Sequence, residues 1–148
     1  SGFPNLFTIT GPGSPSVLAN MIVAIEQHVD WISDCLKHLE KHSYQVIVAD
    51  EAAEEKWGLE VNRIADQTLY PEGCNSWYTG ANIPDKPRIF MPYLGFPSYV
   101  QHCEHVARNK YEGFKLNGSS SLVFLMTLFT GRVQVIVARF GESLFVFF

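Results

Sequence analysis

One amphipathic stripe near the start of the chain constrains its fold more than any other feature. From about Pro15 to His42, apolar residues recur at three- and four-residue steps, which is the spacing of one face of an α-helix. They are Leu18, Met21, Ile22, Ile25, Val29, Ile32, Leu36 and Leu39. A helix of this length spans roughly 40 Å, so it needs a sizeable partner surface. The 148 residues suffice for one domain, or for part of a larger one.

A glycine-rich turn precedes this expected helix. The run GPGSPS at residues 11–16 follows an apolar segment, residues 6–10, that we expect to be a strand. Two glycines permit a tight turn and let a ligand approach the backbone, whose N–H groups we expect to be exposed. Ser14 suits the N-cap and Pro15 the first helical position, and a helix start attracts phosphates. Because Ser16 replaces the third glycine of the dinucleotide fingerprint, an ordinary capped turn is the alternative to a cofactor contact.

Downstream, the sequence predicts one short strand, at residues 46–48, and one further helix. Asp50 suits the N-cap of that helix, which we expect to end near residues 69–71; its apolar residues are Trp57, Val61, Ile64 and Ala65. Prolines, glycines and large aromatic rings then break any periodicity from residue 71 to residue 100. Ordered loops of this length are commonly functional, and packing of the rings onto a core is the alternative interpretation.

Composition argues against several classes of function. A net charge of −4 provides no basic surface, so we expect no nucleic-acid binding. The three cysteines, Cys35, Cys74 and Cys103, lie far apart, which argues against a disulfide framework and favours a reducing, cytoplasmic location. The N-terminus shows no signal-peptide pattern. Residues 102–105 (HCEH) place possible metal ligands together, but without a second cluster we expect no metal site.

Several segments, taken in order, resemble the last part of the flavin domain of Baeyer–Villiger monooxygenases. They are Gly2–Phe7, Gly11–Met21, Ile25–Trp31, Asn75–Pro84 and Tyr111–Phe114. The resemblance runs from residue 2 to about 116 and is greatest to the phenylacetone and cyclohexanone monooxygenase branch. It implies an α/β fold: the C-terminal fragment of a flavoprotein with two dinucleotide-binding domains. Residues 1–116 would be the C-terminal part of its FAD-binding domain, with one long helix, a second helix and an aromatic loop region rich in proline and glycine.

The resemblance also implies a chemistry. Enzymes of this family hold FAD, reduce it with NADPH, and use molecular oxygen to convert a ketone into an ester or lactone. The flavin performs the oxidative chemistry while the protein orients it. By resemblance, the cofactor-binding residues are Gly11, Pro12, Gly13, Ser14, Asn20, Met21 and Trp77, and the substrate side is lined by Ser16, Val17 and Leu18. Met21 would contact the flavin through its backbone, and the indole N–H of Trp77 would bind NADP; a loop anchor is the alternative role for Trp77.

Other parts of the family pattern are missing from this sequence. It contains no complete GxGxxG fingerprint, no FxGxxxHxxxWP signature and no counterpart of the active-site arginine. We therefore expect no catalytic residue here, and neither tight FAD binding nor turnover without the upstream FAD and NADP domains. Two positions depart from the family pattern: Asp85 stands where glycine is usual, and Gly95 stands alone where a glycine pair is usual. The alternative function is a small, non-catalytic interaction module derived from such an enzyme.

Residues 117–148 do not resemble the family. Residues 117–121 predict a flexible linker, and three apolar runs at 122–129, 133–140 and 144–148 predict a β meander. Charged residues interrupt these runs, so we expect no membrane helix. A frameshifted or misjoined sequence is the alternative origin of this apolar, β-rich tail.

Overall fold

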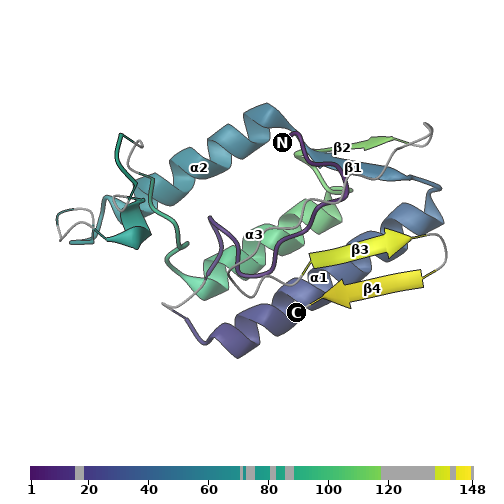
Figure 1. The fold of residues 1–148 in the computed structure, drawn as a ribbon, viewed down its shortest axis with the longest axis horizontal. Coiled ribbons are helices and arrows are strands. Elements are labelled where there is room, and N and C mark those ends of the chain that lie inside the picture. Colours follow the sequence, from purple (N-terminus) through teal and green to yellow (C-terminus); the bar gives the residue numbers. More distant parts are fainter. Residues whose placement is uncertain are drawn as a thin grey trace.

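The computed structural model describes residues 1–15, 19–70, 72, 76–80, 83–85, 89–117, 136–140 and 143–147. In chain order the elements are α1 (Met21–Lys41), β1 (Val46–Ala49), α2 (Glu51–Ala65), the 3-10 helix η1 (Trp77–Thr79), α3 (Phe96–Arg108), β2 (Phe114–Asn117), β3 (Ile136–Phe140) and β4 (Ser143–Phe147). Helices combined with small sheets fit the expected α/β class. Helix α1 packs along α3, and the β1–β2 pair lies beside the start of α2 (Figure 1).

Helix α1 begins later than the sequence predicts. Its N-cap is Asn20, whose side-chain oxygen accepts hydrogen bonds from the second and third helical amides at 3.1 and 3.4 Å. The prediction that Ser14 caps this helix and Pro15 opens it is therefore wrong. The hydroxyl of Ser14 instead donates to the carbonyl of Gly11 at 2.7 Å. Short polar side chains bond readily to nearby backbone, and this favours a turn over a helix start.

The buried face of α1 differs from the predicted apolar stripe in its first half. The buried residues are Ala24, His28, Ile32, Cys35 and Leu39. By contrast, Ile22 is 70% exposed and Val29 is 44% exposed. Small and polar residues occupy core positions here, so hydrophobicity alone misplaces the stripe.

The strand predicted at residues 46–48 is confirmed as β1. It pairs antiparallel with β2, with Val46 opposite Asn117. The sequence does not predict β2, a strand of only four residues whose side chains alternate between half-buried and exposed positions. Asn117 therefore ends a strand, and the prediction that it opens a flexible linker is wrong.

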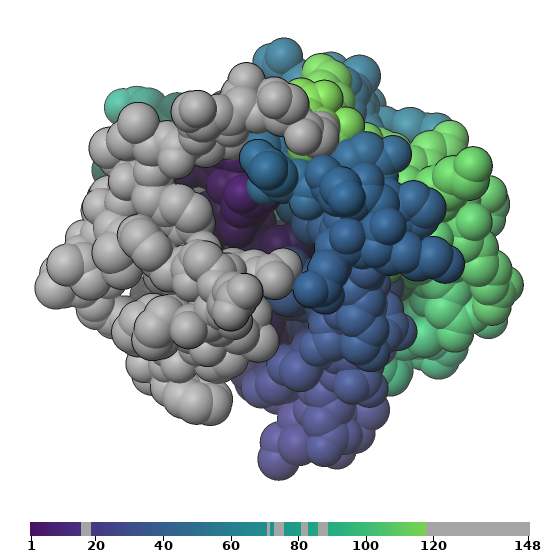
Figure 2. Space-filling model, turned by 90° about the vertical axis from the view of Figure 1, so that its right-hand side faces the viewer, coloured from purple at the N-terminus to yellow at the C-terminus, as the bar shows by residue number. Residues whose placement is uncertain are grey.

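Residues 6–10 do not form the predicted strand; within them only Thr8 forms an isolated β-bridge. A φ of 59° at Asn5 and of 54° at Thr10 turns the chain at both ends of the segment, since extended backbone requires negative φ. Asn5 instead covers β1: its N–H donates to the carbonyl of Ile47 at 2.8 Å, and its side-chain oxygen accepts from the N–H of Ile47 at 3.0 Å. Figure 2 shows these first residues, in purple, recessed behind the blue atoms of the α1–β1 region.

The second predicted helix is confirmed as α2, with Asp50 as its N-cap at 3.1 Å from the amide that it caps. It ends at Ala65, before the predicted end near residues 69–71. The hydroxyl and the N–H of Thr68 both donate to the carbonyl of Ala65, at 2.7 and 2.9 Å. These two bonds take the place of the bond that the carbonyl of Ala65 would accept from an amide four residues later in a continuing helix. The helix therefore ends here in a turn.

Helix α3 is an element that the sequence does not predict, because it begins inside the stretch expected to be irregular. No residue of α3 is buried, and Gly95 and Pro97 at its start favour a turn rather than a helix in the sequence. It is fixed to α1 in part by the indole N–H of Trp31, which donates to the carbonyl of Cys103 at 2.9 Å.

Two groups of buried residues form the interior. We call the first the strand-side core; it consists of Cys35, Leu39, Ile47 and Tyr111. We call the second the turn-side core; it consists of Val61, Ala65, Phe90 and Tyr93. The strand-side core joins α1 to β1, whereas the turn-side core joins α2 to the segment before α3.

In the tail, β3 and β4 form an antiparallel hairpin with Ile136 opposite Phe147. These strands overlap the second and third predicted apolar runs, and the three-stranded meander stays a prediction. Residues 118–121 and the first predicted run, 122–129, lie outside the described residues. Among the described helices, none is long and apolar enough to cross a membrane.

Candidate functional site

The glycine turn (residues 11–14) is fixed by backbone hydrogen bonds to the loop before α3. The N–H of Gly13 donates to the carbonyl of Met91 at 2.6 Å, and the carbonyl of Ser14 accepts from the N–H of Tyr93 at 3.0 Å. The N–H of Ser14 donates within the turn, to the carbonyl three residues earlier, at 3.2 Å. The prediction that the amides of the turn are exposed to a ligand is therefore wrong for Gly13 and Ser14.

Gly13 is required by both its conformation and its surroundings. Its φ is 77°, and a Cβ added to it would lie 2.9 Å from Nε1 of Trp57. That same indole N–H donates to the carbonyl of Gly13 at 3.0 Å. Only glycine adopts this conformation without strain and leaves room for the indole. The turn is therefore seated directly on a side chain of α2, with Pro12 exposed at its tip.

Trp57 is the central ring of an aromatic stack behind the turn. Its indole stacks on the ring of Tyr93, with a centroid distance of 5.1 Å and an interplanar angle of 6°. It also stacks on the ring of His102, with a centroid distance of 4.5 Å and an interplanar angle of 20°. Burial, together with the nearby His105, lowers the pKa of His102, so we expect this ring to be uncharged at neutral pH. The stack brings α2, α3 and the loop between them together behind the glycine turn.

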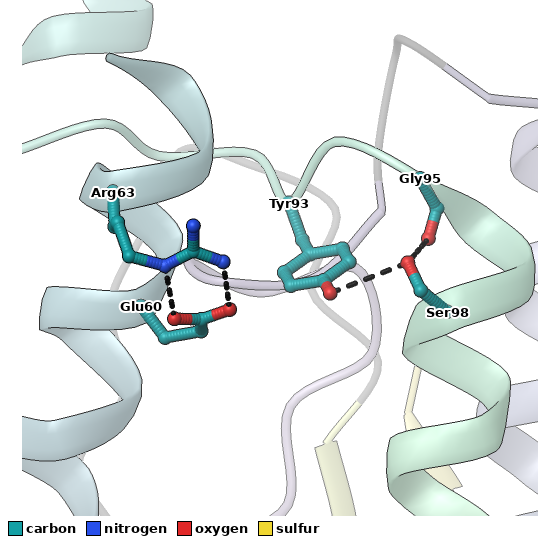
Figure 3. Close-up of polar contacts among 5 residues, drawn as sticks. All are labelled: Glu60, Arg63, Tyr93, Gly95 and Ser98. Atoms are coloured by element: carbon teal, nitrogen blue, oxygen red, sulfur yellow. Dashed lines mark hydrogen bonds and ion pairs between the residues drawn. The ribbon is translucent and has the colours of Figure 1, made fainter. Parts of the chain in front are cut away.

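Tyr93 lies between α2 and α3 (Figure 3): its ring stacks on Trp57 of α2, and its hydroxyl reaches α3. Its hydroxyl donates to the hydroxyl of Ser98 on α3 at 3.3 Å, and Ser98 donates in turn to the carbonyl of Gly95 at 2.8 Å. On α2, Arg63 binds Glu60 through two hydrogen bonds, each of 2.7 Å. Gly95 has a φ of 113° and is the N-cap of α3, so the single glycine at this position is structurally required.

The glycine turn is linked to η1 through one residue. The N–H of Met91 donates to the carbonyl of Tyr78 at 2.6 Å, and the carbonyl of Met91 accepts from Gly13. Trp77, beside Tyr78, is 45% exposed, and its indole N–H has no hydrogen-bond partner in the described part of the chain. The structure thus joins two regions that the resemblance assigns to different cofactors.

The first amide of α1 has no hydrogen-bond partner among the described residues. Asn20 caps the second and third helical amides, which leaves the N–H of Met21 without a hydrogen bond among the described residues. The side chain of Met21 is 40% exposed. A free N–H at a helix start is a suitable donor for a polarised carbonyl or an anion. The substrate-side residues of the resemblance, Ser16, Val17 and Leu18, lie outside the described residues.

Asp85 adopts a left-handed conformation, with a φ of 60°. Glycine is the residue that accepts this conformation most readily, and aspartate tolerates it. Aspartate is therefore compatible with this backbone conformation, at a small cost. Within the described residues, no three histidine, cysteine or acidic side chains form a possible metal site.

Two residues that hold the glycine turn were not singled out from the sequence. Trp57 was assigned only to the apolar face of α2. His28 on α1 accepts a hydrogen bond from the N–H of Thr10 through Nδ1, at 3.1 Å. The one available signal for His28 is its place within the Ile25–Trp31 segment that resembles the family.

Comparisons with known proteins agree with the resemblance. The cyclohexanone 1,2-monooxygenase of Acinetobacter sp is 36% identical over 117 residues, which are 78% of this chain and 21% of that protein. A Baeyer-Villiger monooxygenase of Pseudooceanicola batsensis is 35% identical over 122 residues, 82% of this chain and 20% of that protein. Over about four fifths of its length, the chain is homologous to part of the Baeyer–Villiger monooxygenases. No protein-family model matches it.

Solved structures of Baeyer–Villiger and related monooxygenases share this fold. An oxidized steroid monooxygenase bound to NADP superposes with a TM-score of 0.72 at 40% identity, over 80% of this chain and 21% of that one. The OTEMO complex with FAD and NADP superposes with a TM-score of 0.69 at 31% identity, over 78% of this chain and 21% of that one. The chain therefore spans about a fifth of the length of the monooxygenases that it matches.

Proposed function

We propose that residues 1–116 are the C-terminal part of the FAD-binding domain of a Baeyer–Villiger monooxygenase. The complete enzyme would use FAD and NADPH to insert one atom of molecular oxygen beside a ketone carbonyl, giving an ester or a lactone. The observation that carries the proposal is the hydrogen-bonded link from the glycine turn through Met91 to η1. Through these bonds, two segments to which the resemblance assigns different cofactors would form one continuous wall of the site.

The described residues fit the two cofactors chemically. Two N–H groups, of Met21 and of the Trp77 indole, lack partners in the described part of the chain and can donate to polar atoms of a ligand. We assign Met21 and the preceding Asn20 to the flavin, and Trp77 to NADP. When bound, the flavin supplies the redox chemistry, while this chain orients it and excludes water.

We assign the glycine turn to packing against the flavin ring rather than to donating hydrogen bonds. The amides of Gly13 and Ser14 are already bonded within the protein, so the contribution of residues 11–14 would be shape. A turn without bulky side chains permits close approach of a planar ring. Ser16, Val17 and Leu18, which follow directly, would line the substrate side.

We further propose that the chain requires the remaining part of such an enzyme for activity. The sequence contains no GxGxxG fingerprint, and that motif supplies the contacts to the cofactor's pyrophosphate. One wall of the site without these contacts would hold FAD weakly. The apolar tail, residues 117–148, would take no part in the cofactor site.

A segment exchange tests this function. Residues 2–116 replace the matching segment of the Acinetobacter cyclohexanone monooxygenase, and FAD content and ketone-dependent NADPH oxidation are measured on the purified protein. We expect the exchanged enzyme to retain FAD and some activity, and the same enzyme with Gly13→Val to lose FAD. A folded exchange protein that never retains FAD would contradict the proposal and support the alternative, an interaction module without a redox role.

A further inference from the structure

Thr10, directly before the glycine turn, is held in a strained conformation. Its φ is 54°, a left-handed value that is unfavourable for a β-branched residue. Its hydroxyl donates to the carbonyl of Ile9 at 2.7 Å, and its N–H donates to Nδ1 of His28 at 3.1 Å. Strain of this kind persists only where surrounding contacts enforce it, and among the described residues the hydrogen bond to His28 reaches Thr10 from another element.

This hydrogen bond defines the state of His28. Because Nδ1 accepts, the ring hydrogen of the neutral imidazole must be on Nε2. Nε2 is buried and has no hydrogen-bond partner among the described residues, and the whole residue is only 6% exposed. A charged imidazolium would place one unpaired N–H in the interior and a second against the N–H of Thr10. The site therefore accepts only the neutral ring.

Among the described residues, the side chains of other elements next to His28 are uncharged at neutral pH as well. The ring of Tyr99 on α3 packs edge to face against the His28 ring, with a centroid distance of 5.6 Å. Cys103 lies one helical turn after Tyr99 on the same helix. Burial raises the pKa of both the Tyr99 phenol and the Cys103 thiol, so both are neutral at neutral and acidic pH. From the N-terminal segment, Thr10 contributes no titratable group. Burial alone lowers the pKa of His28, with no charged side chain of the described residues contributing.

We propose that His28 is a positioning residue for the flavin-facing turn: its neutral imidazole holds Thr10 in the left-handed conformation that directs residues 11–14. The inference rests on the proposed function of that turn. Protonation at Nδ1 would replace the acceptor with a donor, break the bond to Thr10 and let this residue relax to an ordinary φ. The turn would then shift, and FAD affinity would fall at acidic pH.

The sign of the pH effect follows from the lowered pKa of His28. Above the usual histidine value of about 6.5, the ring is neutral in both the folded and the unfolded chain, and the contribution to stability is complete. As the pH falls below that value, the unfolded chain binds the proton first, so stability declines until the folded ring is also protonated. If only the neutral form binds FAD, affinity falls about tenfold for each pH unit below the pKa of the folded ring.

The first test is NMR spectroscopy of the complete 148-residue chain labelled with 15N, without any cofactor. We expect His28 to show the tautomer with the hydrogen on Nε2 at pH 7.5, and its titration midpoint to lie below 6.5. The Thr10 amide resonance should shift with the same midpoint. A hydrogen on Nδ1 at pH 7.5, or a Thr10 amide that does not follow His28, would overturn the proposal.

Two variants of His28 distinguish the role of its hydrogen-bond acceptor from the role of its aromatic ring. Asn at this position places an acceptor oxygen near the location of Nδ1 but does not titrate, so His28→Asn should keep the Thr10 amide shift and remove its pH dependence. His28→Phe should lose that shift at every pH, and adding Thr10→Gly should restore the turn, because glycine needs no support at this φ. Identical behaviour of the Asn and Phe variants would overturn the proposal.

The same variants are then placed in the exchanged enzyme, where FAD dissociation constants are measured between pH 5 and pH 8. We expect the acidic loss of affinity in the parent and its absence in His28→Asn. If the exchanged enzyme binds no FAD while the NMR results hold, the proposed function fails and the role of His28 stands. An unchanged pH profile of FAD binding in His28→Asn would overturn that role.

Discussion

The strand-side core and the turn-side core are of similar size but are built differently. Three of the four residues of the strand-side core come from regular elements, Cys35 and Leu39 from α1 and Ile47 from β1, and Tyr111 comes from the turn between α3 and β2. The turn-side core joins α2 to a segment without regular structure, and polar contacts complete it. One of these is the side-chain oxygen of Asn62, which accepts from the N–H of Phe90 at 2.8 Å.

This difference indicates that the strand-side core contributes most to the stability of the fold, whereas the turn-side core fixes the geometry of the candidate site. Regular elements satisfy their own backbone groups, so the strand-side core depends mainly on apolar burial. The irregular segments around the glycine turn depend on individual side chains, Trp57 among them. Substitutions in the first core should affect folding generally, whereas substitutions in the second should affect the site out of proportion to their effect on stability.

The largest expected effect lies in the strand-side core. Ile47 is 4% exposed, and Ile47→Ala removes buried methyl groups and leaves a cavity. We expect a loss of about 3 kcal/mol in the free energy of unfolding, measured by urea denaturation. The folded fraction should keep the parent's chemical shifts at the glycine turn; a displaced Gly13 amide would show that the two cores are not separable.

The next effect lies at the glycine turn. Gly13→Ala forces a Cβ into a left-handed position beside Trp57, and we expect a loss of about 2 kcal/mol. Unlike Ile47→Ala, this variant should also reduce FAD retention in the exchanged enzyme. Full FAD retention would mean that the turn does not shape the cofactor site.

A smaller effect is expected from Trp57→Phe, which keeps a stacking ring and removes the indole N–H. The carbonyl of Gly13 loses its side-chain donor, so we expect a loss of about 1 kcal/mol in urea denaturation. The matched control is Trp31→Phe, which removes a comparable bond to the carbonyl of Cys103 far from the turn. Equal effects of both variants on FAD retention would contradict the claim that the contacts around the glycine turn shape the cofactor site more than contacts elsewhere.

The smallest effect lies outside both cores. Asp85 has a φ of 60°, so Asp85→Gly relieves backbone strain while it adds freedom to the unfolded chain. We expect a net gain of no more than about 0.5 kcal/mol in thermal or urea unfolding. A clear loss would show that the aspartate side chain has a structural role.

Elements with a strong local signal could be predicted from the sequence. The apolar run of β1 and the capping residue Asp50 of α2 are both confirmed, because their signals lie within a few residues. Helix α3 was missed because Pro92, Gly95 and Pro97 break the sequence pattern where it begins. The strand expected at residues 6–10 failed because Asn5 and Thr10 turn the chain at its ends.

The candidate site was predictable in part. The conformational demand on Gly13 follows from the glycine pattern and is confirmed by its φ of 77°. The roles of Trp57 and His28 depend on contacts across 44 and 18 residues of sequence, and no local pattern contains them. The predicted helix start at Ser14 failed because the hydroxyl bonds to its own turn.

The most direct test of the account is to add FAD and NADP⁺ to the 15N-labelled chain and to follow the amide and indole resonances. If this chain forms part of the cofactor site, we expect weak, saturable shifts of the Met21 amide and of the Trp77 indole N–H. The Trp31 indole N–H should not shift. Saturable binding that leaves the Met21 and Trp77 resonances unchanged, while residues elsewhere respond, would contradict the account.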